Sequence, residues 1–254
     1  MIDFTLIWAV IIAFGVIMYV LLDGFDLGMG ILYPFAPDEE SRDVMMNTVA
    51  PFWDGNETWL VLGGAGLLGA FPLVYSVLLP ALYLGVFLLL AGLIFRGVAF
   101  EFRFKASPAR KKYWSTAFAV GSTVAALAQG IVVGAYIQGF ETENFAYTGG
   151  AFDWLTPFTV LAGVGLVLGY GLLGSTWIIM KTEGAVQDWA YRITPRLLAG
   201  VLGVFLIISF WTPLVDSFAR DRWFSHLHLI WLLPAGALGC AYLIMRAVAR
   251  RNEG

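Results

Sequence analysis

The sequence contains very few cysteine, histidine and charged residues. Of its 254 residues, one is Cys and two are His, while Asp, Glu, Lys and Arg together make up 13%. The single Cys240 excludes a disulfide framework and a CxxC or CxxCH site for metal or covalent heme. The net charge is only −3, and the basic residues fall in short clusters, so nucleic acid is a poor partner. No dinucleotide, Walker A, zinc-protease or nucleophile-elbow motif is present, so the chain lacks the parts of a complete active site.

The two histidines, His226 and His228, are poorly spaced for holding a heme between helices. A heme with two His ligands needs them on facing helices at matched depth, whereas residues two apart on one helix point in different directions. We interpret both as side chains at the outer membrane interface. The seven methionines show no placement that favours ligation either. The sequence therefore predicts no metal site and favours interfacial histidines over heme ligands, with methionine ligation left open in principle.

Hydrophobic residues are abundant instead, at 59% of the chain, and the mean hydropathy is +0.79. These values lie far outside the range of a soluble domain and indicate an integral membrane protein. Pro72 and Pro80 mark the expected boundary between the second and third helix. We predict an all-α polytopic bundle of about seven transmembrane helices. They are expected at 5–33, 57–79, 80–102, 115–139, 157–180, 197–216 and 228–248.

The distribution of Lys and Arg predicts the orientation, because cytoplasmic loops are enriched in them. The segment 103–112 holds five basic residues, and the loop 140–153 holds none. Further basic residues at 181–196 and 246–251 indicate the cytoplasmic side. Seven alternating crossings then place the N-terminus outside and the C-terminus inside. Parity alone places the loop 34–52 inside.

The first candidate site is "LLDGFDLGMG", where Asp23 and Asp26 follow about eighteen uncharged residues. Side chains three apart on a helix share a face. A carboxylate in hydrocarbon costs several kcal/mol unless it meets a partner, a cavity or a proton, so such acids are functional candidates by default. We interpret Asp23 as part of a proton relay. Asp26, nearer the cytoplasmic end, fits a relay or an interfacial position equally well.

The second candidate site is the polar stretch that opens the next apolar run. Its polar side chains are Asp54, Asn56, Glu57 and Thr58. Amide and hydroxyl groups beside carboxylates can sustain a chain of waters. In the structural alternative, Asp54 or Asn56 caps the helix and Glu57 is favoured by its dipole. Trp53 and Trp59 bracket the stretch as interfacial residues.

The third candidate site is "IFRGVAFEFRFK", at the end of the expected third helix. Arg96 lies about two turns inside the basic cluster, deep enough to require a counter-ion. Three acids are candidate partners: Asp23, Asp54 and Glu57. Glu101 is a further charged residue of this segment, whereas we interpret Arg103 and Lys105 as ordinary cytoplasmic anchors.

These three motifs, in this order and spacing, resemble subunit II of the cytochrome bd type quinol oxidases, including the cyanide-insensitive branch. The segments that carry the resemblance are "LLDGFDLGMG", "APFWDGNETWLVLGGAGLLGAFPLVY" and "FRGVAFEFR". Further along, "GGAFDWLTPFTVLAGVGLVLGYGLLGSTW" is also similar to this family. The resemblance covers the whole chain and is most specific in residues 21–104.

The resemblance implies a subunit of a multi-pass terminal oxidase in the bacterial inner membrane, which passes electrons from quinol to dioxygen and forms water. In this family the b-type and d-type hemes belong to subunit I, the expected partner, and subunit II is free of heme. A structural quinone is a further expectation, although nothing in the sequence locates its site. A small accessory subunit and membrane lipids complete the implied partners.

The resemblance also implies a proton path from the cytoplasm toward the heme site. Asp23 of "DGFD" and Asp54 of "WDGN" carry over by motif, and Asp26 and Glu57 carry over less directly. Arg96 is the expected electrostatic partner of these acids. Family members normally continue beyond this length, so we expect a four-helix bundle at 1–139 and the start of a second, incomplete one at 140–254.

Two other classes of protein are compatible with acids inside the membrane. One is a proton-coupled secondary transporter, although we find no convincing pair of broken helices in corresponding halves. The other is a purely structural scaffold in which every acid caps a helix or forms an ion pair. A visible absorption spectrum of the native complex separates the first class from the oxidase, because heme bands accompany only the latter.

Overall fold

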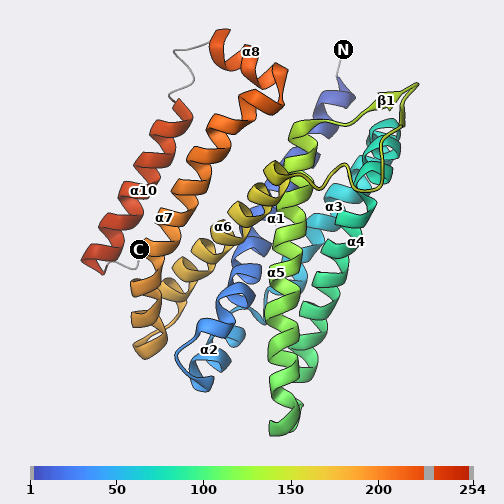
Figure 1. Cartoon of the computed structure of the whole chain (residues 1–254). Helices are drawn as coiled ribbons and strands as arrows, with labels where there is room; N and C mark the ends of the chain where they lie inside the picture. The colour runs from blue at the N-terminus through green and yellow to red at the C-terminus, as the bar shows by residue number, and fades with distance from the viewer. Residues whose placement is uncertain (1–2, 226–231, 252–254) are drawn as a thin grey trace.

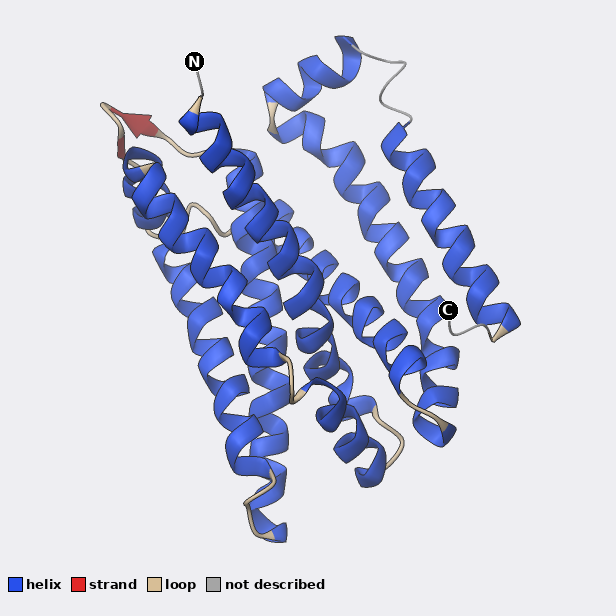
Figure 2. Cartoon of the chain, turned by 180° about the vertical axis from the view of Figure 1, so that it is seen from behind, coloured by secondary structure: helices blue, strands red, loops and turns tan. Residues whose placement is uncertain are grey.

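The computed structural model describes residues 3–225 and 232–251, and helices dominate them (Figures 1 and 2). Seven helices of at least 18 residues run along the long dimension of this described part. They are α1 (Phe4–Leu32), α3 (Trp53–Ala70), α4 (Pro72–Arg103), α5 (Pro108–Gln138), α6 (Pro157–Lys181), α7 (Gly184–Val215) and α10 (Leu232–Arg250). The predicted all-α architecture is confirmed.

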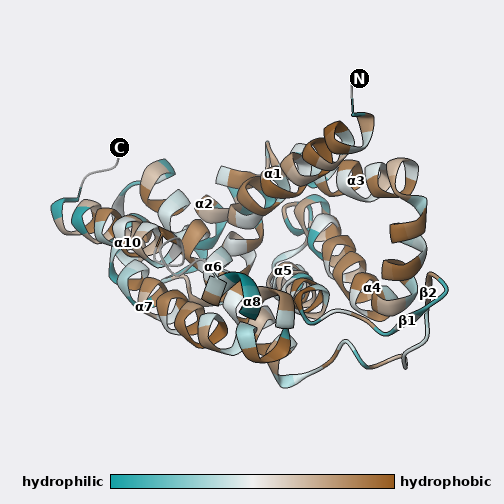
Figure 3. Cartoon of the chain, turned by 90° about the horizontal axis from the view of Figure 1, so that it is seen from above, coloured by the Kyte–Doolittle hydropathy of each residue, from teal (hydrophilic) through white to brown (hydrophobic). Residues whose placement is uncertain are grey.

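Shorter elements connect the long helices at the two ends of the bundle. At one end, η1 (Tyr33–Phe35) and α2 (Glu39–Val49) join α1 to α3. At the other end, β1 (Thr142–Glu143) and β2 (Ala146–Tyr147) form a small antiparallel hairpin between α5 and α6. The helix α8 (Ser217–Ser225) follows α7 at that same end. Seen from above, hydrophobic residues dominate the helices, and hydrophilic ones appear at the hairpin, in α8 and at the end of α10 (Figure 3).

Local sequence signals explain where several helices begin. The side chain of Asp3 accepts hydrogen bonds from the first backbone N–H groups of α1. A proline stands in the first turn of α4, α5 and α6, where its missing N–H costs nothing. Thr156 and Thr159 form a capping box before α6.

The predicted boundary at Pro80 is wrong. The chain breaks at Phe71, just before Pro72, and Pro80 lies inside α4. Membrane helices tolerate an internal proline because neighbouring groups satisfy the freed carbonyl. Two other expectations also differ, since the segment 34–52 contains the helix α2 and α7 begins thirteen residues before its apolar run at 197. A prediction based on hydropathy alone misses the polar residues at the start of a helix.

Five of the described helices are long and apolar enough to cross a membrane: α1 with η1, α4, α5, α6 and α7. The first turns of α3 are polar, which keeps it outside this group. The basic segments at 103–112, 181–196 and 246–251 lie at one end of the bundle (Figure 1). This arrangement is the one expected for a polytopic membrane protein. The number of crossings, the orientation and the division at residue 139 stay predictions.

Glycines allow the central helices to approach closely. Gly28 of α1 faces Gly174 of α6, and a Cβ built on Gly174 would lie 2.6 Å from the Gly28 carbonyl carbon. Gly92 of α4 and Gly121 of α5 meet in the same way. Because lipid tails are as apolar as the helix surfaces, no hydrophobic force drives membrane helices together. Close packing of this kind is therefore a main source of helix–helix association. The contact between α1 and α6 also fixes the position of the acids on α1.

We expect Gly174→Ala to loosen this contact, because backbone atoms of α1 cannot yield to the added methyl group. The cost should be about 1–3 kcal/mol. The matched control is Gly169→Ala on the same helix, where a Cβ meets nothing within 4 Å. It should be neutral, or stabilising by up to about 1 kcal/mol. Thermal unfolding of the two variants in detergent checks this, and equal midpoints would contradict it.

Candidate functional site

A fully buried arginine joins three helices at the end of the bundle that carries α2. Arg96 of α4 places Nη2 2.6 Å and Nη1 2.9 Å from Oδ1 of Asp23 on α1. The same Nη2 lies 2.7 Å from Oε1 of Glu57 on α3. The side chains of Asp23 and Arg96 are 0% exposed, and that of Glu57 is 24% exposed. We call these three residues the Arg96 cluster.

Aromatic rings cover the guanidinium of Arg96. Its Cζ lies 5.6 Å from the ring centroid of Trp53 and 6.0 Å from that of Phe100. The two rings stack on each other with centroids 5.0 Å apart. A cation over a desolvated aromatic face gains up to about 2 kcal/mol. Trp53 therefore has a packing role at the cluster beyond the interfacial one that its sequence position predicted.

A second buried acid, Asp26, lies beside the cluster without a cation of its own among the described residues. The side-chain amide of Asn56 donates to Asp26 Oδ2 at 2.8 Å and to the Leu22 carbonyl at 3.4 Å. Asp26 is 0% exposed. Asn56 thus links α3 to α1 through hydrogen bonds and does not cap α3. The N-cap residue of α3 is Phe52, whose side chain makes no capping hydrogen bond. Glu57 likewise pairs across helices.

Each buried aspartate keeps one oxygen without a hydrogen-bond partner in the described part of the chain. These atoms are Asp23 Oδ2 and Asp26 Oδ1. A buried carboxylate oxygen left unpaired costs free energy, which a proton or a water molecule relieves. Both acids are therefore chemically suited to take up and release protons.

Buried tyrosines extend the polar group along the bundle, and the sequence reasoning missed them. Tyr19 lies one turn before Asp23 on the same face of α1, is 2% exposed, and interacts electrostatically with that aspartate. Tyr170 of α6 donates its hydroxyl hydrogen to Gln129 Oε1 at 3.0 Å. A tyrosine spaced four residues from an intramembrane acid is the signal that could have found Tyr19.

The other predicted site residues lie outside the cluster. Asp54 is exposed in the first turn of α3 and has no ion pair among the described residues, so it is not a partner of Arg96. Glu101 is exposed and pairs with Lys105 at 3.1 Å. Trp59 contacts Phe14 edge to face, with ring centroids 5.8 Å apart. The structure thus separates a buried group of acids from an exposed one.

Arg103, interpreted from the sequence as an ordinary cytoplasmic anchor, is instead buried in a network of ion pairs. Its side chain is 0% exposed and holds Asp43 Oδ1 at 2.6 Å and Glu39 Oε1 at 2.7 Å. Lys111 of α5 contacts the same two acids at 2.9 Å and 3.1 Å. Ser115 accepts a hydrogen bond from Arg103 Nε at 3.0 Å. We call Glu39, Asp43, Arg103 and Lys111 the α2 cluster.

The acids of the α2 cluster are held in their charged form. Partial burial raises the pKa of Glu39 and Asp43, but hydrogen bonds from Lys111 and the nearby Arg103 charge outweigh it. The net result is a pKa below the usual range for both carboxyls. The α2 cluster is therefore a structural ion network that ties α2 to α4 and α5.

The described residues offer no group of three or more His, Cys, Asp or Glu side chains that could hold a metal ion. His226 and His228, which we predicted not to be ligands, lie outside the described residues.

Comparison with known proteins identifies relatives along the whole chain. The sequence model of the family described as "Cytochrome bd terminal oxidase subunit II" matches residues 4–254. A "Probable cytochrome oxidase subunit 2" of Haemophilus influenzae is 31% identical, over 97% of this chain and 73% of that protein. The "Cytochrome bd-I ubiquinol oxidase subunit 2" of Escherichia coli K12 is 34% identical, over 83% of this chain and 57% of that protein.

The "Cytochrome bd ubiquinol oxidase subunit 2" of Bacillus subtilis is 29% identical, over 80% of this chain and 61% of that protein. The matches to the Escherichia coli and Bacillus subtilis relatives therefore span less than two thirds of the length of those proteins.

We expect Arg96→Met to destabilise the protein strongly, because it leaves Asp23 buried and unpaired. The cost of breaking such a pair is about 3–5 kcal/mol. The double variant with Asp23→Asn should lose less than the sum of the two single variants. The control Lys105→Met removes an exposed pair and should cost less than about 1 kcal/mol. Thermal unfolding measures all four, and additive losses would contradict the direct interaction.

We expect the stability contributed by Asp43 to depend on pH in a definite direction. Because its pKa is lowered on folding, the unfolded chain binds the proton first, and the contribution is present above about pH 4 and lost below it. Asp43→Asn should therefore unfold a few degrees lower than the wild type at pH 6, and the gap should close toward pH 3. The exposed Glu40→Gln on the same helix is the control. A gap that stays constant with pH would contradict this role.

Proposed function

The chain belongs to the family of cytochrome bd terminal oxidase subunit II, and we propose that it supports quinol oxidation and dioxygen reduction in a heme-bearing subunit I. In this proposal the chain supplies part of the path by which protons reach the partner from the cytoplasm. The observation that carries the proposal is the Arg96 cluster. Two acids in it are joined by one buried guanidinium, and Asp23 keeps an oxygen without a partner in the described part of the chain.

The exposed and buried acids suggest an order for the path. Asp54 lies at the surface of the first turn of α3, where a proton can arrive from water. In the same turn of α3, Asn56 contacts Asp26 of α1 and Glu57 contacts Arg96 of α4. Asp23 is the most enclosed acid and would be the last group in this chain. We propose this sequence of groups as the proton inlet.

Arg96 would set the electrostatics of the inlet. Its single positive charge balances one ionised carboxylate but not two. A cluster with one guanidinium and two acids can therefore hold one extra proton on either acid. A proton that arrives on Glu57 weakens the attraction of Arg96 for that acid and strengthens its pairing with Asp23. The aromatic cover of Trp53 limits water at the guanidinium and increases these effects.

Proton uptake from the cytoplasm would make the reaction electrogenic. Reduction of dioxygen to water consumes one proton for each electron. If quinol releases its protons on the outer side and the reaction takes them from the inner side, charge crosses the membrane without a pump. The partner's hemes would carry the electrons and reduce the oxygen. This chain would act from the bacterial inner membrane, with a structural quinone as a further proposal.

We expect Asp23→Asn to lower oxidase turnover and charge separation at least tenfold in the assembled complex, because the amide cannot carry the proton. Asp54→Asn should cost only a few-fold, since water can replace an exposed acid. Oxygen consumption and membrane-potential measurements in reconstituted vesicles check both variants. Normal heme bands in the absorption spectrum would show that assembly is intact.

The control for the inlet is Glu143→Gln, in the exposed hairpin at the opposite end of the bundle. It should leave turnover unchanged. A shift in the pH profile of turnover for Asp23→Asn separates proton transfer from a merely structural effect. Fully assembled Asp23→Asn and Asp54→Asn variants with unchanged turnover and charge separation would refute the inlet.

A further inference from the structure

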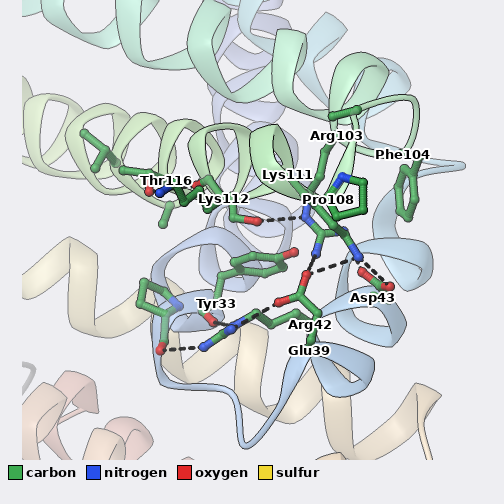
Figure 4. Close-up of a pocket in the computed structure, with 15 residues that line it drawn as sticks. Tyr33, Glu39, Arg42, Asp43, Arg103, Phe104, Pro108, Lys111, Lys112 and Thr116 are labelled. Carbon is green, nitrogen blue, oxygen red and sulfur yellow. Dashed lines mark hydrogen bonds and ion pairs between the residues drawn. The ribbon is translucent and has the colours of Figure 1, made fainter.

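A cavity of about 960 Å³ opens beside the α2 cluster, at the end of the bundle where α4 ends and α5 begins (Figure 4). Its wall comes from η1, α2, the end of α4 and the first turns of α5. The proton inlet proposed above does not use it. The charged residues that line it are Glu39, Arg42, Asp43, Arg103, Lys111 and Lys112.

The cavity carries a net charge of +2, because four cations line it and two acids do. Arg42, Arg103 and Lys111 share the two carboxylates of Glu39 and Asp43. Lys112 has no carboxylate partner among the described residues and contacts the ring of Tyr113 instead. The excess positive charge of the cavity is thus available to an anion from outside the chain.

The wall formed by α5 changes from basic to apolar along a single helix face. Lys112, Thr116, Ala119 and Val120 are spaced by four, seven and eight residues, so they lie on one face. Eight residues rise about 12 Å. Over that length the face passes from an ammonium group through a hydroxyl to a methyl and an isopropyl group. Val120 is 55% exposed and lies on the surface of a helix apolar enough to span the membrane.

We propose that this cavity binds the phosphate of an anionic phospholipid, with an acyl chain along the apolar part of α5. The order of charge, hydroxyl and hydrocarbon on the α5 face matches the order of phosphate, glycerol and acyl chain in a lipid. Basic pockets between membrane helices on the cytoplasmic side bind lipid headgroups for this reason. A soluble phosphate would use the basic part of the cavity and leave the apolar part without a role.

The α2 cluster would hold the basic wall in place. Arg103 is buried and its donors are satisfied by Asp43, Glu39 and Ser115, so it cannot leave to meet the ligand. Arg42 also donates to the carbonyl groups of Tyr33 and Pro34. Lys112 is the cation free to move toward a phosphate. It is therefore the residue whose removal should weaken binding most directly.

The test uses the complete oxidase complex, purified in detergent and depleted of lipid. Phosphatidylglycerol, phosphatidylcholine and inorganic phosphate are titrated separately, and the rise in unfolding temperature gives each affinity. Phosphatidylglycerol should bind measurably tighter than phosphatidylcholine, and inorganic phosphate should have little effect. Native mass spectrometry should show phosphatidylglycerol retained on the complex.

Lys112→Gln should weaken phosphatidylglycerol binding about fivefold, as expected for one basic residue near a lipid surface. The matched control is Lys105→Gln, an exposed lysine that pairs with Glu101 and does not line the cavity. It should leave the affinity unchanged. Because Lys112 is exposed, the substitution should not disturb folding.

Each contrary result overturns the proposal in a distinct way. Equal affinity for the two lipids would mean that the cavity does not discriminate between lipids by the charge of their headgroup. An equal effect of inorganic phosphate would identify a free anion as the ligand. Unchanged phosphatidylglycerol binding in Lys112→Gln would place the lipid elsewhere on the complex. A complex that binds no phosphatidylglycerol would refute the lipid site.

Discussion

The structure depends on the need to compensate a guanidinium that is completely buried among membrane helices. Arg96 cannot be exposed to water, so its charge must be balanced within the bundle. Asp23 from α1 and Glu57 from α3 provide that balance, and the rings of Trp53 and Phe100 enclose it. The same contacts that hold three helices together also bring two acids onto one guanidinium.

A second buried arginine repeats this arrangement two turns further along α4. Residues seven apart on a helix lie on nearly the same face, so Arg96 and Arg103 point into the bundle in similar directions. Arg103 also holds two acids, but both come from α2, and they are half-exposed. The deeper arginine therefore joins the acids of the proposed proton inlet, and the outer one holds a structural ion network beside a basic cavity.

In our two proposals, the two clusters at this end of the chain have separate tasks. The Arg96 cluster contains Asp23, which keeps one oxygen without a hydrogen-bond partner in the described part of the chain and which the proposed inlet uses to exchange protons. The α2 cluster contains fully paired acids with lowered pKa values, which suits a rigid wall. The excess positive charge of the cavity comes from Arg42 and Lys112, which line it outside the α2 cluster.

The sequence alone determined the all-α membrane fold and the family, because long apolar runs have no other stable arrangement in lipid and the motifs around Asp23, Asp54 and Arg96 are local. It also showed that Arg96 needs an acid. Only the tertiary structure decided which one, since Asp23 and Glu57 lie 73 and 39 residues away. It likewise buried Arg103, whose partners Glu39 and Asp43 are 64 and 60 residues distant. Hydropathy measures the cost of burying a charge, whereas helix packing selects the residue that compensates it.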